Sequence, residues 1–183
     1  MLRRSIAVLL ALVALWAAVC PTGCGTKPQI RNLSLSGPPD NYLSMKWELR
    51  TRTHVEKLPA GLACVVQADP APTRTPYGGI VLPGDGAKGF RLDLAFMNPG
   101  AIVTCYVDAY DAQAQRIARW ESRKALTLPS ARATYAFMPG KLPAVFRAVG
   151  EWKRGAIDQI HVFLQVVPGK TAGIAMFRAQ LLM

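Results

Sequence analysis

Four segments of the chain alternate apolar and polar residues strictly. The apolar positions are Leu43, Met45, Trp47 and Leu49, then Leu62, Cys64 and Val66, then Phe90, Leu92, Leu94 and Phe96, and finally Val103, Cys105, Val107 and Ala109. A period of two places successive side chains on opposite faces, so each segment is predicted to be a β-strand with one buried face. Turn residues separate these segments at 37–40, 83–86 and 98–100. This organisation predicts an all-β fold, an antiparallel β-sandwich.

The last part of the chain, residues 129–183, carries two further apolar stretches. One contains Ile157, Ile160, Val162, Leu164 and Val166, the other runs from Ile174 to Met183, and Pro168-Gly169-Lys170 separates them. The simplest interpretation is a hairpin of two β-strands. Residues 144–154 fit either a short helix or another strand, because periodicity alone does not distinguish them. We expect this C-terminal β extension to add to the sheet or to form a small second unit.

The first residues have the order of an export signal. Arg3 and Arg4 precede an apolar run from Ser5 to Val19, which is too short for a membrane-spanning helix of about 20 residues. Thr22 and Gly23 then precede Cys24. This arrangement resembles a bacterial lipoprotein signal, in which a small residue stands just before the acylated cysteine. Pro21 departs from the pattern, because the lipoprotein family usually has Leu there.

The lipoprotein resemblance implies a processed and anchored protein. Residues 1–23 would be removed, Cys24 would carry the lipid, and 24–28 would form a short linker. Several acyl chains give stable membrane anchoring. Because residue 25 is Gly and not Asp, the resemblance implies a bacterial envelope protein that is lipid-anchored at the outer membrane and faces the periplasm.

Residues 29–128 resemble a fibronectin type III domain. Trp47 stands where that family has its early core tryptophan, and Met97-Asn98-Pro99-Gly100 resembles its Leu-x-Pro-Gly corner. The segment from Val103 to Ala109 resembles the Tyr-x-Val-x-Val-x-Ala strand, with a polar turn at 111–113 and a last strand from Trp120 to Leu128. Val103 replaces the corner tyrosine of the family. The resemblance implies a sandwich of the fibronectin type III or immunoglobulin-like kind over 29–128.

Two cysteines, Cys64 and Cys105, would remain in the exported protein, where disulfides are permitted. We therefore expect one bridge, which closes a loop of about 42 residues and contributes on the order of 4 kcal/mol. The alternative is a pair of buried free thiols. The fibronectin type III resemblance implies that the two cysteines lie on neighbouring strands of one sheet.

The net charge and the polar residues limit which partners and activities are expected. The formal net charge is +11, which favours anionic lipids, acidic glycans or acidic protein surfaces as partners, although the exported location argues against nucleic acid. His54 and His161 lack metal-ligand spacing, and no metal, cofactor or catalytic motif is predicted. Asp108 and Asp111 are interpreted as a solvated strand end and turn.

The sequence thus predicts a non-enzymatic, protein-binding or assembly module of the bacterial envelope. The alternative is recognition of an anionic glycan, such as peptidoglycan or lipopolysaccharide, by the basic C-terminal region, with exposed Trp152 or Tyr135 stacking on the sugars. Exposed aromatic residues beside basic ones would favour the glycan, and an apolar patch or open strand edge would favour a protein partner. The candidate binding residues are Arg147, Trp152, Lys153, Arg154 and Lys170.

Overall fold

The computed structural model describes residues 29–35, 43–46, 51–71, 76–123 and 128–183. Nearly all of these residues lie in β-strands or in the turns between them. The elements are β1 (Ile30–Leu33), β2 (Leu43–Lys46), β3 (Thr51–Leu58), β4 (Gly61–Ala68), β5 (Tyr77–Ala87), β6 (Gly89–Met97), the short 3-10 helix η2 (Pro99–Ala101), β7 (Ile102–Tyr110), β8 (Arg116–Ser122), β9 (Ala133–Phe137), β10 (Phe146–Ala148), β11 (Ile157–Val166) and β12 (Thr171–Leu182).

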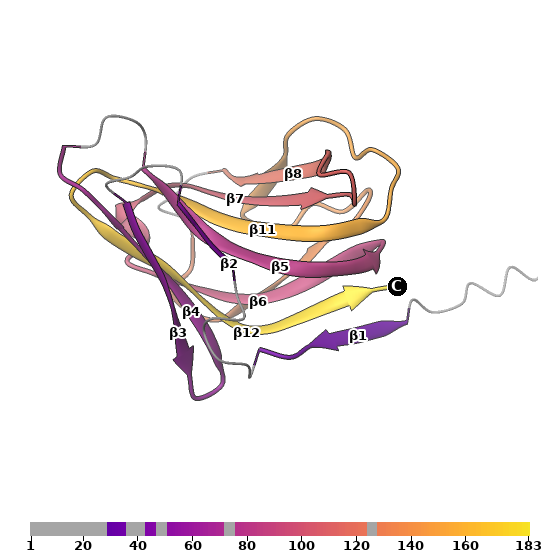
Figure 1. Ribbon diagram of the computed structural model, residues 1–183, viewed down its shortest axis with the longest axis horizontal. Helices are drawn as coiled ribbons and strands as arrows, with labels where there is room; N and C mark the ends of the chain where they lie inside the picture. The colour runs from indigo at the N-terminus through magenta and orange to yellow at the C-terminus, as the bar shows by residue number, and fades with distance from the viewer. Residues whose placement is uncertain (1–28, 36–42, 47–50, 72–75, 124–127) are drawn as a thin grey trace, which may run out of the picture.

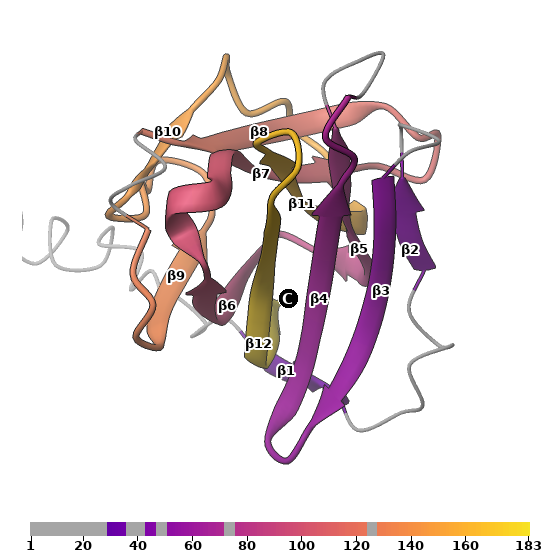
Figure 2. The same cartoon turned by 90° about the vertical axis from the view of Figure 1, so that its left-hand side faces the viewer.

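The strands form two antiparallel sheets that face each other, so the predicted β-sandwich is confirmed (Figure 1). Sheet A has the order β3, β4, β12, β6, β9, and β1 pairs with the C-terminal half of β12. Sheet B has the order β10, β8, β7, β11, β5, β2. Figure 2 shows β12 between β4 and β6, near the middle of sheet A.

The alternating apolar positions supply the core between the sheets. The β6 side chains Phe90, Leu92, Leu94 and Phe96 are buried, and so are those of Ile160, Val162 and Leu164 on β11. Burying each large apolar side chain contributes about 1.5 to 3 kcal/mol. The intervening positions point away from the opposite sheet and form two outer faces. Among the residues that the structure describes, no helix is both long and apolar enough to cross a bilayer.

Residues 129–183 are not an extension of a sandwich that ends at 128. β11 lies between β7 and β5 in sheet B, and β12 lies between β4 and β6 in sheet A. The expected hairpin of β11 and β12 is also wrong, because the turn at Pro168-Gly169-Lys170 carries the chain from one sheet to the other. Residues 144–154, which fitted either a helix or a strand, contain the short strand β10, with Phe146 buried and Ala148 exposed.

Three predicted turns or strands take a different local form. The Pro83–Gly86 segment forms an irregular bulge within β5. Gln159 on β11 pairs with Pro83, but Ile157 pairs with Ala87. Val103 is 44% exposed, because the register with β11 jumps between Thr104 and Ile102 and Ile102 is buried instead. β8 begins at Arg116, earlier than the expected last strand. Trp47, the turn at 37–40 and the signal with Cys24 lie outside the described residues.

The expected bridge between Cys64 and Cys105 is absent. Both cysteines are buried free thiols. Cys64 lies on β4 of sheet A and Cys105 on β7 of sheet B, so the two strands are not sheet neighbours. Burial raises the pKa of Cys64 to about 12 and also raises the pKa of Cys105. The structure therefore agrees with the alternative of two inert thiols.

Candidate functional site

The outer face of sheet B carries aligned rows of polar and aromatic side chains. The register of β5, β11, β7 and β8 brings their outward positions side by side. From β5 to β8, one row is Gly79, Phe163, Tyr106 and Glu121, the next is Val81, His161, Asp108 and Arg119, and the third is Pro83, Gln159, Tyr110 and Arg116. Strand β5, the hairpin of β7 and β8, and strand β11 thus come from separate parts of the sequence and build one surface.

Three aromatic rings form the centre of this surface. The rings of Tyr106 and Phe163 are stacked, with centroids 5.0 Å apart and an interplanar angle of 20°. Tyr77 on β5 extends the group, with its centroid 6.2 Å from that of Tyr106 and 6.0 Å from that of Phe163. A side chain in place of Gly79 would collide with Phe163, so glycine there lets β5 approach β11 closely.

An arginine lies over the aromatic group and is fixed by a buried carboxylate. The Arg119 guanidinium carbon is 5.0 Å from the Tyr106 centroid and 5.8 Å from that of Phe163. Arg119 Nε donates to Asp108 Oδ1 at 2.8 Å, and Nη2 donates to Oδ2 at 2.6 Å. The Asp108 side chain is fully buried, contrary to the solvated strand end expected from the sequence. This bidentate geometry positions the guanidinium rigidly.

Tyr110 and His161 continue the surface beside the Asp108 and Arg119 pair. The Tyr110 hydroxyl donates to Asp108 Oδ2 at 3.2 Å, and the ring centroids of Tyr110 and His161 are 4.3 Å apart. Burial lowers the pKa of His161, although Asp108 acts in the opposite direction. Burial also raises the pKa of Tyr77 and Tyr110. We call Tyr77, Tyr106, Tyr110, His161 and Phe163, with the Arg119 and Asp108 pair, the aromatic face.

The five residues predicted to bind do not form one surface. Arg147 on β10 donates from Nε to Glu121 Oε1 at 2.7 Å, at the edge of sheet B. Trp152 is half-buried, and exposed Lys153 and Arg154 follow it before β11. Lys170 lies beyond the other end of β11, a ten-residue strand that spans about 30 Å. The basic patch that the sequence predicted is therefore split.

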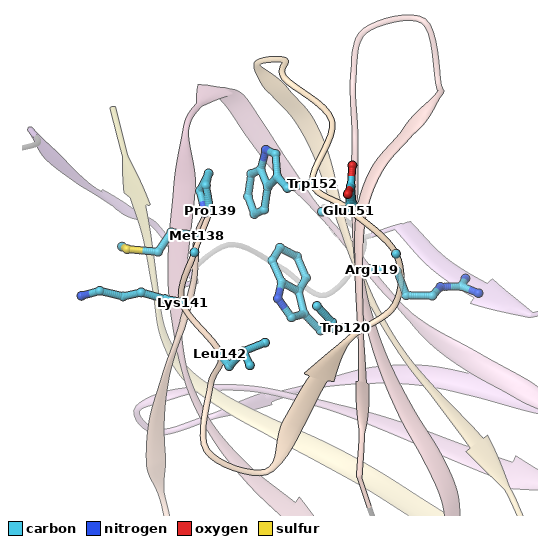
Figure 3. Close-up of a pocket in the computed structure, with 12 residues that line it drawn as sticks. Arg119, Trp120, Met138, Pro139, Lys141, Leu142, Glu151 and Trp152 are labelled. Atoms are coloured by element: carbon cyan, nitrogen blue, oxygen red, sulfur yellow. The ribbon is translucent and has the colours of Figure 1, made fainter.

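Trp152, one of the predicted binding residues, lines a pocket. The pocket has a volume of about 320 Å³ and lies between β8, the turn after β9 and the loop after β10 (Figure 3). The Trp152 ring packs edge-to-face on Trp120, with centroids 5.1 Å apart. Arg119 links the two regions, because it lines this pocket and also covers the aromatic face.

The sequence analysis missed most of the aromatic face. Tyr106 and Phe163 occupy outward positions of strands whose other residues alternate regularly, and large aromatic residues at such positions are a usable signal. The pairing of β7 with β11, which makes them neighbours, does not follow from either segment alone. Among the described residues, no cluster of three or more His, Cys, Asp or Glu side chains could hold a metal ion.

Comparisons with known proteins bear on the fold. No protein-family model matches the chain, and no curated protein matches it. Among solved structures, a xylan-binding module is similar with a TM-score of 0.52 at 7% identity, over 85% of this chain and 97% of the module. A family 11 carbohydrate-binding module from Clostridium thermocellum, in complex with a β-1,3-1,4-mixed-linked tetrasaccharide, has a TM-score of 0.47 at 16% identity, over 84% of this chain and 95% of the module.

A third similar structure is much longer than this chain. It is an arabinose-bound α-L-arabinofuranosidase, with a TM-score of 0.48 at 9% identity, and the match covers 84% of this chain and 25% of that one. The chain thus spans about a quarter of the enzyme and nearly all of the two modules. The likeness to the xylan-binding module supports the assignment of this chain to the β-sandwich fold.

Proposed function

We propose that this protein is a non-catalytic glycan-binding module and that the aromatic face binds the glycan chain. The observation that carries the proposal is the stacked pair of Tyr106 and Phe163 under the Arg119 guanidinium, on an outer sheet face. Ligand sites typically combine aromatic walls with a few fixed polar groups. The aromatic face has both: its tyrosines are partly exposed, whereas Phe163 is 6% exposed and supports the ring of Tyr106.

The chemistry of the face suits a sugar chain. A pyranose ring presents apolar C–H groups on its faces, which pack on aromatic rings, and hydroxyls around its edge, which need hydrogen-bond partners. Tyr77, Phe163 and Tyr106 lie on three adjacent strands and so extend over about 10 Å. Gln159 and Gln165 also lie at outward positions of β11, beside the rings. This surface is long enough for more than one sugar ring.

The charges of the face favour a neutral chain over an anionic one. The positive charge of Arg119 is compensated by Asp108, and that of Arg147 by Glu121. Burial lowers the pKa of His161, which disfavours its cationic form. Arg116, at the end of the third row beside Tyr110, forms no ion pair with another described residue. A polyanion would therefore meet an uncompensated cation at the margin of the face but not at its centre.

The same ion pairs argue against hydrolysis. Glycoside hydrolases generally need one carboxyl group that is protonated and a second that is free to act as base or nucleophile. On this face the two carboxylates, Asp108 and Glu121, are both held by arginines. Binding without bond cleavage is the activity that this arrangement supports.

The similar structures suggest which glycans to test. Those described above bind xylan, a mixed-linked β-1,3-1,4-tetrasaccharide and arabinose. Affinity electrophoresis in gels that contain xylan, mixed-linked β-glucan, arabinan or mannan would measure binding. Polygalacturonate, peptidoglycan and lipopolysaccharide provide the anionic comparison. We expect retardation by at least one neutral polysaccharide.

The variant Tyr106→Ala tests the face. Loss of one aromatic contact of about 1.4 kcal/mol lowers affinity about tenfold. Phe177→Ala is the matched control, because Phe177 is also a half-buried aromatic residue under an arginine, with Arg132 at 5.0 Å, but it belongs to sheet A. Equal retardation of wild type and Tyr106→Ala, or loss of binding only in Phe177→Ala, would contradict the proposal.

We further propose that the protein is anchored to the bacterial envelope through lipid on Cys24. The support is the basic, apolar and small-residue order of residues 3–24. Labelling with a fatty-acid analogue should mark the wild type and not Cys24→Ser, whereas Cys20→Ser should keep the label. Undiminished labelling of Cys24→Ser would exclude this site.

A further inference from the structure

The pocket beside Trp152 adjoins the aromatic face at Arg119 and is lined by three segments of the chain. Its lining comes from Ala118–Trp120 of β8, Met138–Leu142 after β9, and 148–152 around the end of β10. In Figure 3, Trp120 and Trp152 lie between the Met138 to Leu142 segment and Arg119, whose side chain points away from the pocket. A volume of about 320 Å³ lies at the lower end for ligand sites, which suits a single ring.

The walls are held in place by the core and by backbone hydrogen bonds. Trp120 is 2% exposed, and its ring packs edge-to-face on Phe90 and Phe137, with centroids 5.8 Å and 5.0 Å away. The loop after β10 is bound to β8 on both sides of Trp152, by Val149 N to Arg119 O and Lys153 N to Ile117 O, each 2.9 Å. Trp152 therefore rests on a rigid aromatic support.

The pocket combines this aromatic wall with polar groups at its rim. Lys141 and Glu151 are exposed on opposite sides, and neither forms an ion pair with another described residue. Glu151 supplies an anionic acceptor at the rim, whereas the Lys141 ammonium points away from the two tryptophan rings in Figure 3. Gly140 and Gly150 adopt positive φ angles of 72° and 79° and have open space where a side chain would be, so neither turn obstructs the rim.

We infer that this pocket binds the terminal sugar ring of a glycan, as a second site distinct from the aromatic face. An aromatic wall with a carboxylate acceptor at the rim matches a pyranose, which has an apolar face and a hydroxylated edge. A pocket lined by three segments admits the end of a chain, whereas the flat aromatic face allows a chain to continue in both directions. This inference rests on the proposed function for one point, that the ligand is a glycan.

Fluorine NMR of full-length protein labelled with fluorotryptophan tests this site. Trp152→Phe identifies the Trp152 resonance, and xylose, glucose and mannose at millimolar concentration are the probes. Millimolar concentrations are used because a single ring makes few contacts and is expected to bind weakly. We expect at least one sugar to shift the Trp152 resonance in wild type. The same shift should persist in Tyr106→Ala, which removes the central ring of the aromatic face and no residue of the pocket lining.

Two further variants place a phenylalanine at exposed alanines. Ala148→Phe fills the pocket from β10, and we expect it to abolish the sugar-induced shift. Ala131→Phe, before β9 and outside the pocket lining, is the matched control and should keep the shift. The inference is overturned if no sugar shifts the Trp152 resonance, if Ala148→Phe leaves the shift intact, or if indole shifts the resonance and the sugars do not. Loss of the shift in Tyr106→Ala would mean one shared site.

Discussion

Two buried aspartates organise the outer faces of the sandwich at the level of single residues. On sheet B, Asp108 holds Arg119 over the aromatic rings. On sheet A, Asp93 accepts from Arg132 Nη2 at 2.6 Å and from Thr134 Oγ1 at 2.8 Å, and Arg178 Nε lies 3.0 Å away. Each carboxylate is satisfied by hydrogen bonds, as a buried charge requires.

Asp93 makes the stability of the protein sensitive to acid. Burial acts to raise the pKa of Asp93, but hydrogen bonds from Arg132, Thr134 and Arg178 outweigh it and lower the pKa below its ordinary value. Between the folded and unfolded pKa values, the unfolded chain binds more protons, so the free energy of unfolding falls as pH falls below about 4. We expect urea unfolding midpoints to show this loss.

Asp93→Asn should be less stable at neutral pH and should lose less stability between about pH 5 and about pH 3. Asp158→Asn, an exposed carboxylate on β11, is the control and should follow the wild type. Parallel pH curves for wild type and Asp93→Asn would show that this carboxylate does not contribute to the acid sensitivity.

Cys64 and Cys105 should behave as inert thiols. Because only the thiolate reacts and burial raises the pKa of both side chains, alkylation of the native protein should be slow. Unfolding without a reductant should expose both thiols to the reagent, and mass spectrometry should detect two alkylated residues. An unmodified pair that reacts only after reduction would instead establish a disulfide.

At the level of elements, periodicity predicted strands but not their partners. The alternation of Phe90 to Phe96 and of Ile160 to Val166 correctly identified buried faces of β6 and β11. The turn at 168–170 could close a hairpin or cross between sheets. Its Pro-Gly-Lys sequence is compatible with both, so it could not distinguish them. The central places of β11 and β12 depend on long-range pairing, which no local pattern contains.

The central positions of β11 and β12 predict that residues 29–128 do not fold alone. Without residues 129–183, β7 and β5 in sheet B and β4 and β6 in sheet A lose the strand that joins them. A fragment that ends at 128 should lack the dispersed NMR spectrum and cooperative unfolding of the full chain. A fragment with native-like dispersion would restore the division at residue 128 that the sequence suggested.

The candidate site was predicted poorly for a related reason. Trp152 was found from its type and its basic neighbours, and it does line a pocket. Tyr106, Phe163 and Arg119 come from three separate strands, and only the register makes them neighbours. Asp108 was assigned to a solvated end because its partner, Arg119, is across a hairpin whose register the sequence does not state.

At the level of the whole molecule, the two outer faces differ in character. The centre of the sheet A face has a row of small residues, Ala63, Ala175 and Ala95, across β4, β12 and β6. The corresponding region of sheet B has large aromatic rings and a fixed guanidinium. A glycan that binds by stacking on aromatic rings should therefore bind to the sheet B face and not to the sheet A face.

The most direct test of the account is to map where a glycan binds on isotopically labelled protein by NMR. Titration with the oligosaccharide of the polysaccharide that binds best, for example xylohexaose for xylan, should shift amide signals of outward residues on β5, β7 and β11. Tyr106 and Phe163 should be among them, and signals around Ala175 on sheet A should stay in place. Shifts confined to the sheet A face, or none with any of the neutral glycans tested, would contradict the central claim.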